Sequence, residues 1–329
     1  MKISENWLRT WVNPAVDSNT LSDQLTMLGL EVDDLSPAAK PFTGVVVGEV
    51  LTVEQHPDAD RLRVTTVNIG SGEPLQIVCG APNVRVGMKA PVATIGAVLP
   101  GDFKIKKGKL RGIESQGMLC GASEIDLEDK IDGLLELPVD APVGVDIREY
   151  LQLDDHVIDI SITPNRGDCF SIRGIAREIG VINQLTVTAP EINAVAATIA
   201  DEKKVVVSTE GCPRYLGRVI KNVNTKAATP EWMERALVRS GIRQHSILVD
   251  ITNYVLMELG QPLHAFDAAK IQGSVQVRQA NTAEKLVLLN EQEVELNEKV
   301  MVIADDEKAL AIAGIMGGLS SSVTDETQD

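Results

Sequence analysis

The sequence predicts a multidomain α+β protein, in which a small β-barrel is inserted into an α/β domain and a second α/β domain follows. Its 329 residues suggest two or three domains rather than one large core. Between residues 44 and 147 the sequence consists of short β-branched runs separated by glycine and proline, and helical patterns flank it on both sides. Many short strands with glycine turns are typical of a small closed barrel.

The N-terminal 35 residues have apolar side chains at helical spacing. Leu21, Leu25 and Leu28 fall on one face, and Gly29 follows at the expected helix end. A linker is expected at 36–41. Because this piece is too short to bury a core alone, we expect residues 1–36 to pack with 151–185.

The barrel strands are expected where β-branched residues alternate with turn signals. The candidates are residues 44–53, 62–69, 75–78, 90–95 and 103–110.

After the barrel, helical patterns alternate with short strands. We expect a strand at 157–162, a turn at 163–166, a helix at 171–182 and a linker near 188–200. Two further helices are expected: one begins at Thr229-Pro230-Glu231 and stops at Gly241, and one spans 246–259 with Ser246 as a cap.

Charge and cysteine usage limit the classes of function. With 31 basic and 47 acidic side chains the net charge is −16, so overall charge does not favour binding of nucleic acid, and any RNA contact needs a local basic patch. The sequence shows no secretory signal and no apolar run of about 18 residues. The cysteines form no C-x-x-C pair, so we expect a reduced, cytoplasmic protein without disulfides, structural zinc or another metal site.

Residues 102–111 carry the basic patch. If they form a hairpin turning at Lys107-Gly108, one face of the ribbon presents four cations: Lys104, Lys106, Lys109 and Arg111. Phe103, Ile105 and Leu110 then turn towards the barrel. The patch has two interpretations, a phosphate-binding face or a solvated edge that prevents aggregation.

Other polar residues favour structural roles. Cys79 and Cys120 have apolar neighbours and are expected to be small buried thiols. His56 precedes a proline and is expected to order a loop by hydrogen bonding.

The histidine and glycines near the C-terminus carry two interpretations each. His264 lies in a short extended piece, and Asp267 is expected to cap the next short helix. A lone histidine of this kind is usually structural. Gly314, Gly317 and Gly318 indicate either a tight connection with positive φ or a pocket wall without side chains, and their spacing is not that of a dinucleotide fingerprint.

Several longer motifs resemble one family. The barrel region contains HPDADRL (56–62), IVCGAPN (77–83) and GMLC (117–120), which resemble the OB-fold tRNA-binding module of several tRNA-handling proteins. The flanks resemble bacterial phenylalanyl-tRNA synthetase β-subunits specifically, in SENWL (4–8), TPNRGDC (163–169), VDITNYV (249–255), ELGQPLHAFD (258–267) and AGIMGG (313–318).

The resemblance implies a domain plan. It comprises a split N-terminal α/β domain at 1–40 and 148–200, an OB-fold β-barrel at 41–147, and a partial α/β editing domain at 205–329. Family members continue past residue 329, so the sequence resembles the N-terminal portion of such a subunit, and further pocket residues, one of them acidic, are expected there.

The resemblance also implies a function. Such subunits support ATP-dependent charging of tRNA(Phe) in an α2β2 enzyme with the synthetase α-subunit, and they carry an editing site that hydrolyses tyrosyl-tRNA(Phe). Mg²⁺ and ATP are implied for the holoenzyme at residues outside this chain, and neither a membrane nor DNA is an expected partner. Two alternatives remain open beside this function, a non-enzymatic tRNA-binding protein built around the OB module and a fragment that mainly supports assembly.

The resemblance assigns roles at the editing site. Catalysis is expected from His264, as a base or an orienting group, with Gly317 and Gly318. Substrate binding is expected from Arg243, Asn253 and Gly314, and His264 and Arg243 are expected near the tRNA 3′ end.

Overall fold

The computed structural model describes residues 1–127 and 132–329 and is a mixed α/β structure with several sheets. The chain divides into two compact units, which are described separately. The first unit is Met1–Leu35 with Ile158–Asp329, and the second unit is Ser36–Val157.

The first unit begins with a helical layer on a small sheet. Strands β1 (Lys2–Ser4), β11 (His156–Ser161) and β2 (Glu31–Pro37) pair in the order β1-β11-β2. Helices α1 (Glu5–Trp11), α2 (Ser18–Met27) and α4 (Ile172–Asn183) contribute to one core with this sheet, and its fully buried members include Ile3, Leu21, Leu25, Ile158 and Ile172. The first 35 residues and the segment after Ile158 thus share a core that neither could form alone.

The helix ends follow the capping signals in the sequence. The Ser4 and Ser171 hydroxyls accept hydrogen bonds from Trp7 N and Gly174 N, at 3.1 and 3.0 Å. Gly29 has a φ of +83° immediately after α2, as a glycine helix end requires. The predicted turn at 163–166 lies in a 3₁₀ helix, η2 (Pro164–Cys169).

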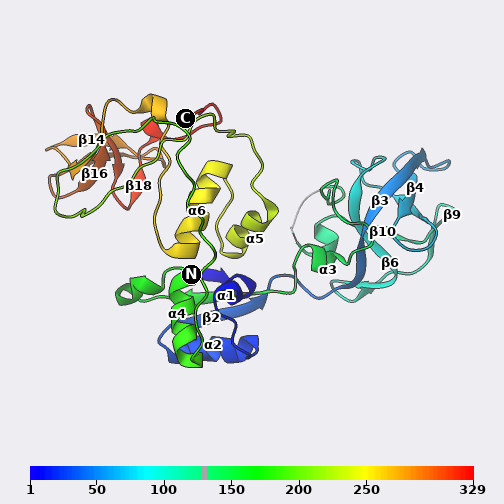
Figure 1. Ribbon diagram of the computed structural model, residues 1–329. Helices are drawn as coiled ribbons and strands as arrows, with labels where there is room; N and C mark the ends of the chain where they lie inside the picture. The colour runs from blue at the N-terminus through cyan, green and yellow to red at the C-terminus, as the bar shows by residue number, and fades with distance from the viewer. Residues whose placement is uncertain (128–131) are drawn as a thin grey trace. The chain divides into compact units, whose positions relative to one another are not determined.

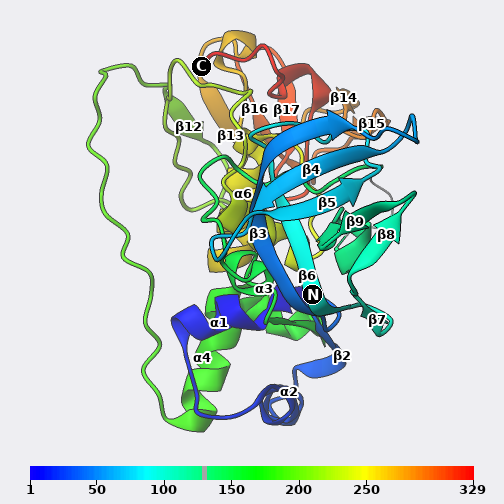
Figure 2. The same cartoon turned by 90° about the vertical axis from the view of Figure 1, so that its right-hand side faces the viewer.

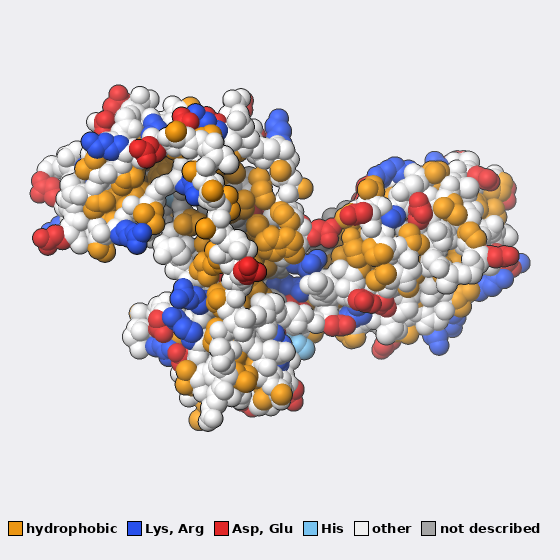
Figure 3. Space-filling model, in the orientation of Figure 1, with side chains coloured by type: hydrophobic (Ala, Val, Ile, Leu, Met, Phe, Trp, Pro, Cys, Tyr) orange, Lys and Arg blue, Asp and Glu red, His pale blue; other side chains and the backbone are white. Residues whose placement is uncertain are grey.

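Helices α5 (Glu231–Arg239) and α6 (Ile247–Leu259) pack on the same core. Tyr254 of α6 stacks on Trp7 of α1, with ring centroids 4.8 Å apart, and Met257 is buried among the N-terminal residues. The expected cap of α6 differs, because the Ser246 hydroxyl makes no capping bond and the buried Asp250 carboxylate accepts from His245 N instead. Hydrophobic side chains remain exposed around α5 (Figure 3). Trp232 and Val238 of this helix are both exposed.

The last part of the first unit is a β-structure with its own cores. The sheet order is β12-β13-β16-β17-β18, formed by Val205–Val207, Val275–Gln279, Met301–Ala304, Ala309–Ile312 and Met316–Gly317. Strands β14 (Glu284–Val287) and β15 (Glu293–Leu296) form a separate hairpin. Between α4 and β12 a long segment has no regular structure, as Figure 2 shows, which agrees with the linker expected near 188–200.

The second unit is built on an antiparallel sheet with the order β10-β6-β3-β4-β5 (Figures 1 and 2). The main strands are β3 (Thr43–Gln55), β4 (Arg63–Asn68), β5 (Leu75–Cys79), β6 (Lys89–Leu99) and β10 (Gly117–Leu119). Strands β3, β4, β5 and β6 coincide with the strands expected at 44–53, 62–69, 75–78 and 90–95, whereas β10 was not predicted. The 3₁₀ helix η1 (Ser123–Ile125) and helix α3 (Ile147–Tyr150) follow.

The predicted closed barrel is not present among the described residues. The edge strands β5 and β10 approach each other, but the backbone bond that joins this region is the one from Gln116 N to Gln76 O, at 2.8 Å. The Ser115 hydroxyl adds a bond from Val78 N at 3.1 Å. Strand composition alone does not show whether the two edge strands of a sheet pair along their whole length or meet through single hydrogen bonds.

The basic segment is also folded differently from the prediction. Strand β7 (Phe103–Lys104) pairs with β6, whereas β8 (Gly108–Leu110) pairs with β9 (Ile113–Ser115). The tight turn is at Arg111-Gly112, where both residues have positive φ, +44° and +87°, as a two-residue hairpin requires. The prediction of a hairpin that turns at Lys107-Gly108 is therefore wrong. The actual turn residues, Arg111-Gly112, do not have the Asn-Gly or Asp-Gly sequence that usually marks such a turn.

Candidate functional site

His264 lies directly against Gly317. A Cβ atom placed on Gly317 would be 2.3 Å from His264 Cε1 and 2.8 Å from its Nε2, so a side chain there would displace the imidazole from its position. The backbone φ of Gly317 is not positive, which makes close approach, rather than strain, the reason for a glycine. Two segments about 50 residues apart in sequence thus meet at a single contact.

A second set of bonds holds these two segments together. Asp267, which is buried, accepts from the Thr327 hydroxyl at 2.9 Å, and its backbone N–H donates to Ser321 O at 3.0 Å. Phe266 forms an isolated bridge with Ser322. The predicted cap is confirmed, since the Asp267 carboxylate accepts from Ala269 N at the start of η3 (Ala268–Lys270). The role of Thr327 had no visible signal in the sequence.

The three glycines have different structural reasons. Gly314 has a φ of +72° and open space around it, so it serves the turn between β17 and β18. At Gly318 a Cβ would lie 2.6 Å from Leu310 O, and the Gly318 N–H already donates to that oxygen at 2.7 Å. The space expected beside Gly317, where a side chain is absent, is therefore filled by the His264 imidazole.

The surroundings of His264 favour the neutral imidazole. One side of the ring remains exposed, yet burial among the neighbouring atoms lowers the pKa of His264 below the ordinary value. Phe266 contacts it edge-on, with ring centroids 4.4 Å apart. A neutral imidazole carries an acceptor nitrogen, which can take a proton or hold a hydroxyl group.

Arg243 and Asn253 lie in the helical part of the first unit. Arg243 is exposed in the loop between α5 and α6, and Asn253 is half-buried within α6. Within residues 1–127 and 132–329 no hydrogen bond joins either of them to His264. Their convergence on the His264 site stays a prediction.

The four predicted cations of the second unit are exposed but do not share one ribbon. Lys104 belongs to β7, Lys106 to the connection after it, and Lys109 to β8, where it pairs in register with Glu114. Glu114 also binds Lys107 at 2.9 Å, and that ion pair lowers the pKa of the Glu114 carboxyl. Of the expected inward residues, Ile105 is buried, whereas Phe103 is 59% exposed and Leu110 is 40% exposed.

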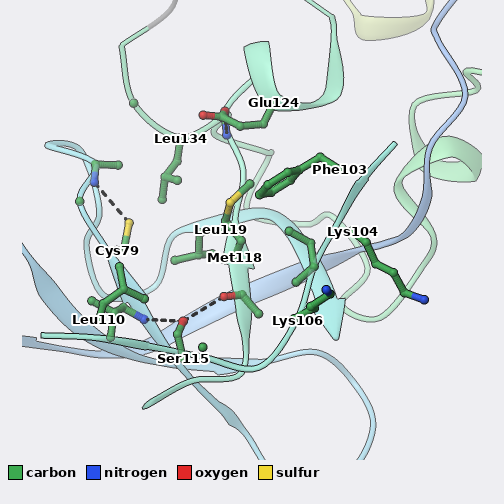
Figure 4. A pocket seen from close by; sticks show the side chains of 18 of the residues that line it. Cys79, Phe103, Lys104, Lys106, Leu110, Ser115, Met118, Leu119, Glu124 and Leu134 are labelled. Atoms are coloured by element: carbon green, nitrogen blue, oxygen red, sulfur yellow. Dashed lines mark hydrogen bonds between the residues drawn. The ribbon is translucent and has the colours of Figure 1, made fainter. Parts of the chain in front are cut away.

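A cavity of about 620 Å³ explains these exposed apolar side chains (Figure 4). Phe103, Ile105 and Leu110 all line it, and so do Met118 and Leu119 of β10. Cys79, Leu134 and Glu124 complete much of the wall. No short sequence pattern indicates this cavity, because its lining comes from segments spread over more than fifty residues.

The predicted structural roles of His56 and two cysteines are confirmed. His56 is buried and its Nδ1 accepts from Asp58 N at 3.1 Å, so its Nε2 donates to Leu110 O at 3.2 Å. Cys79 and Cys120 are buried thiols, and burial raises the pKa of Cys120 to about 12. His56 thereby fixes strand β8 against the loop that follows β3.

Asp168, Cys169 and Glu178 form a cluster that resembles a set of metal ligands, with ligand atoms within 4.8 Å of one another. Arg166 already fills it, since its guanidinium lies 3.1 Å from Asp168, 2.9 Å from Glu178 and 2.8 Å from Cys169 Sγ. Burial, followed by the hydrogen bond to Asp168, raises the pKa of Cys169 to about 11. A protonated thiol and a resident cation favour a structural role.

No helix in the described part of the chain is long and apolar enough to cross a membrane.

Comparison with known proteins defines the class first. Residues 45–146 match the family "Putative tRNA binding domain", and residues 211–329 match the family "B3/4 domain", so the chain combines a tRNA-binding-type domain with a B3/4 domain. The His264–Gly317 contact lies within the second match.

Relatives define the family more closely. The chain is 81% identical over 329 residues to the phenylalanine–tRNA ligase β subunit of Acinetobacter baylyi, and 65% identical over 334 residues to that of Psychrobacter arcticus. It covers 42% of each subunit, while 100% and 99% of this chain are matched. The chain belongs to the phenylalanine–tRNA ligase β subunit family and spans about two-fifths of those relatives.

A solved structure also matches. It is an N-terminal fragment of the phenylalanyl-tRNA synthetase β-subunit from Pyrococcus horikoshii, with 15% identity, a TM-score of 0.29, and coverage of 53% of this chain and 54% of that one. The resemblance inferred from the motifs is confirmed by the sequence relatives.

Proposed function

We propose that this chain supplies the tRNA-contacting and editing portion of a phenylalanine–tRNA ligase β subunit. In that role it supports ATP-dependent charging of tRNA(Phe) in an α2β2 enzyme and contributes to hydrolysis of tyrosyl-tRNA(Phe). The observation that carries the proposal is the contact of His264 with Gly317 within the B3/4 match, in a chain whose other unit matches a tRNA-binding domain.

An editing site is needed because a binding pocket discriminates only weakly between phenylalanine and tyrosine. A pocket that selects phenylalanine by apolar packing rejects tyrosine, which adds only a hydroxyl, by about a hundredfold. A second site that hydrolyses the wrong ester overcomes this limit.

His264 is the residue best suited to act on the ester. As a neutral imidazole with an exposed side, it can accept a proton from an attacking water or hold the terminal ribose hydroxyl. The Gly318 N–H is already bonded to Leu310 O and does not serve as an oxyanion donor. Gly317 acts by admitting the imidazole, and Arg243 would provide a cation for the tRNA 3′ end.

The second unit contributes the RNA contact. We assign it an OB-fold-type architecture whose edges meet without a full ladder, supported by the antiparallel order β10-β6-β3-β4-β5 and the tRNA-binding match. The exposed Lys104 and Lys106 supply positive charge in an otherwise acidic chain.

Charging itself belongs to the partner subunit. ATP and Mg²⁺ supply the activation of phenylalanine there, and no residue of this chain is assigned to them. We therefore expect the purified chain to show no phenylalanine-dependent pyrophosphate exchange, and exchange by the chain alone would overturn this division of labour.

The test is deacylation of tyrosyl-tRNA(Phe), measured with the chain alone and with a complete ligase whose β subunit carries these residues. We expect hydrolysis by the complete ligase, and its loss on substitution at His264 with charging retained. Hydrolysis that is indifferent to His264 would reject the editing role. Binding of tRNA without any hydrolysis would leave the non-enzymatic tRNA-binding function.

A further inference from the structure

The cavity in the second unit has the features of a site for one unpaired nucleobase. It is about 620 Å³ in volume, within the range of small-ligand pockets. Its lining is largely apolar, from Leu110, Leu119, Met118 and Leu134. Such a lining suits the flat, weakly hydrated faces of a base.

Phe103 gives this cavity an aromatic wall. Phe103 is 59% exposed although it belongs to a strand, β7, that is paired on β6. Figure 4 shows the ring directed inward, whereas the Lys104 side chain beside it points outward. Aromatic rings exposed at a cationic surface are the usual stacking partners of unpaired bases.

The charges around the cavity are of two kinds. Lys104 and Lys106 lie at the Phe103 side, exposed, and no ion pair among the described residues engages them. Glu124 lies on another part of the lining, and its Oε2 accepts from Gly121 N at 2.7 Å. The ammonium groups suit phosphates outside the cavity, and the carboxylate suits an amino group on the base inside it.

The wall is held in place independently of any ligand. His56 donates from Nε2 to Leu110 O, and the neighbouring Ser115 hydroxyl donates to Gly117 O while it accepts from Val78 N. The β8–β9 segment is therefore fastened to the sheet at two places. The cavity is built into the fold, and Phe103 and the lysines remain free to meet a ligand.

We propose that this cavity binds a single unpaired nucleotide of an RNA. The base stacks on Phe103, its amino group points to Glu124, and the flanking phosphates contact Lys104 and Lys106. This inference rests on the proposed RNA-contacting role of the second unit and names the form of RNA that it takes.

The test uses the whole chain and two RNA octamers, oligocytidylate and oligouridylate, which differ at base position 4 by an amino group against a carbonyl. Binding is measured by fluorescence anisotropy over a salt series. We expect the cytidine octamer to bind more tightly. Phe103→Ala should weaken its binding about tenfold with little change in salt slope, as expected for a lost base stack.

Two further variants separate the contributions. Lys104→Gln with Lys106→Gln should reduce the salt slope by about 1.4, or about 0.7 for each phosphate contact to a single strand, for both octamers. Glu124→Gln, which keeps an acceptor for Gly121 N, should remove the preference for cytidine. Val86→Ala is the matched control, because Val86 is an exposed apolar residue of the same unit outside the cavity lining.

Each outcome decides the proposal. If Phe103→Ala binds the cytidine octamer as tightly as Val86→Ala does, the cavity is not a base site. An unchanged preference in Glu124→Gln would reject the orientation of the base. If the wild-type chain binds neither octamers nor tRNA at low salt, the RNA-contacting role of the unit fails as well, which distinguishes the two failures.

Discussion

The two candidate sites of this chain differ in how their space is used. At His264 the space created by a glycine is filled by an imidazole, and the surrounding segments are fastened by buried polar bonds. In the second unit an apolar cavity is open, and an aromatic ring and cations beside it are exposed. The first arrangement is suited to holding one reactive side chain in place. The second is suited to accepting a ligand from outside the chain.

The largest effect should come from filling the space at Gly317. In the complete ligase, Gly317→Val should lower tyrosyl-tRNA(Phe) hydrolysis at least about a hundredfold, because a side chain there displaces the His264 ring. Phenylalanine charging should be unchanged. Ile315→Val, at an exposed neighbour, is the control. A parallel fall in charging would indicate misfolding rather than a blocked site.

Removing the imidazole should be nearly as damaging. His264→Ala should reduce hydrolysis by up to about a hundredfold. This is the lower end of the rate enhancement that a positioned general acid or base usually contributes. If Gly317 acts through His264, Gly317→Val should add little once His264 is alanine. Full additivity of the two losses in single-turnover deacylation would show that Gly317 contacts the substrate itself.

The pH dependence of editing follows from the state of His264. Burial lowers its pKa below 6.5, so the neutral ring persists as pH falls to that value and is lost only below it. The acid limb of the hydrolysis profile should therefore lie below pH 6.5 and should disappear in His264→Ala. Protonation should also destabilise the folded state over the same acid range. An acid limb above pH 6.5 would contradict this.

The sequence allowed some parts of this comparison to be predicted and not others. The helix ends at Ser171, Gly29 and Asp267 were predictable, because caps depend on local backbone chemistry. The closed barrel and the basic hairpin were wrong, since edge pairing and turn position depend on contacts that no short window contains. The meeting of His264 with Gly317 was expected only through family resemblance, and the cavity not at all.

A partly buried ion pair between Arg278 and Glu284 should stabilise the first unit without affecting the RNA-binding cavity of the second unit. Glu284 binds Arg278 at 2.8 Å and accepts from Asn281 N and Ala309 N, and these bonds lower its pKa. Glu284→Gln should destabilise the first unit by about 2 kcal/mol. Stability from this pair should be present at neutral pH and lost as pH falls through the lowered pKa.

All three tryptophans, Trp7, Trp11 and Trp232, lie in the first unit, so their fluorescence reports its unfolding. Glu293→Gln is the control, because its pair with Lys285 is exposed and should contribute little. RNA binding by the second unit should be unchanged in both variants. Equal effects of the two substitutions would mean that the buried pair contributes no more than the exposed one.

The smallest effect concerns the cations of the second unit. Replacing Lys104, Lys106, Lys109 and Arg111 by glutamine should weaken tRNA binding only a few-fold and make it less dependent on salt, since few phosphates are neutralised by an acidic chain. The structure predicts that the four cations contribute unequally to this effect. Lys109 faces Glu114, which also binds Lys107, so part of its charge is already compensated, whereas Lys104 and Lys106 flank the open cavity. Lys104→Gln with Lys106→Gln should therefore reduce the salt slope more than Lys109→Gln with Arg111→Gln. If both pairs change it equally, the cations act as a diffuse field, and if neither changes it, they are a solvated edge that keeps the sheet from aggregating.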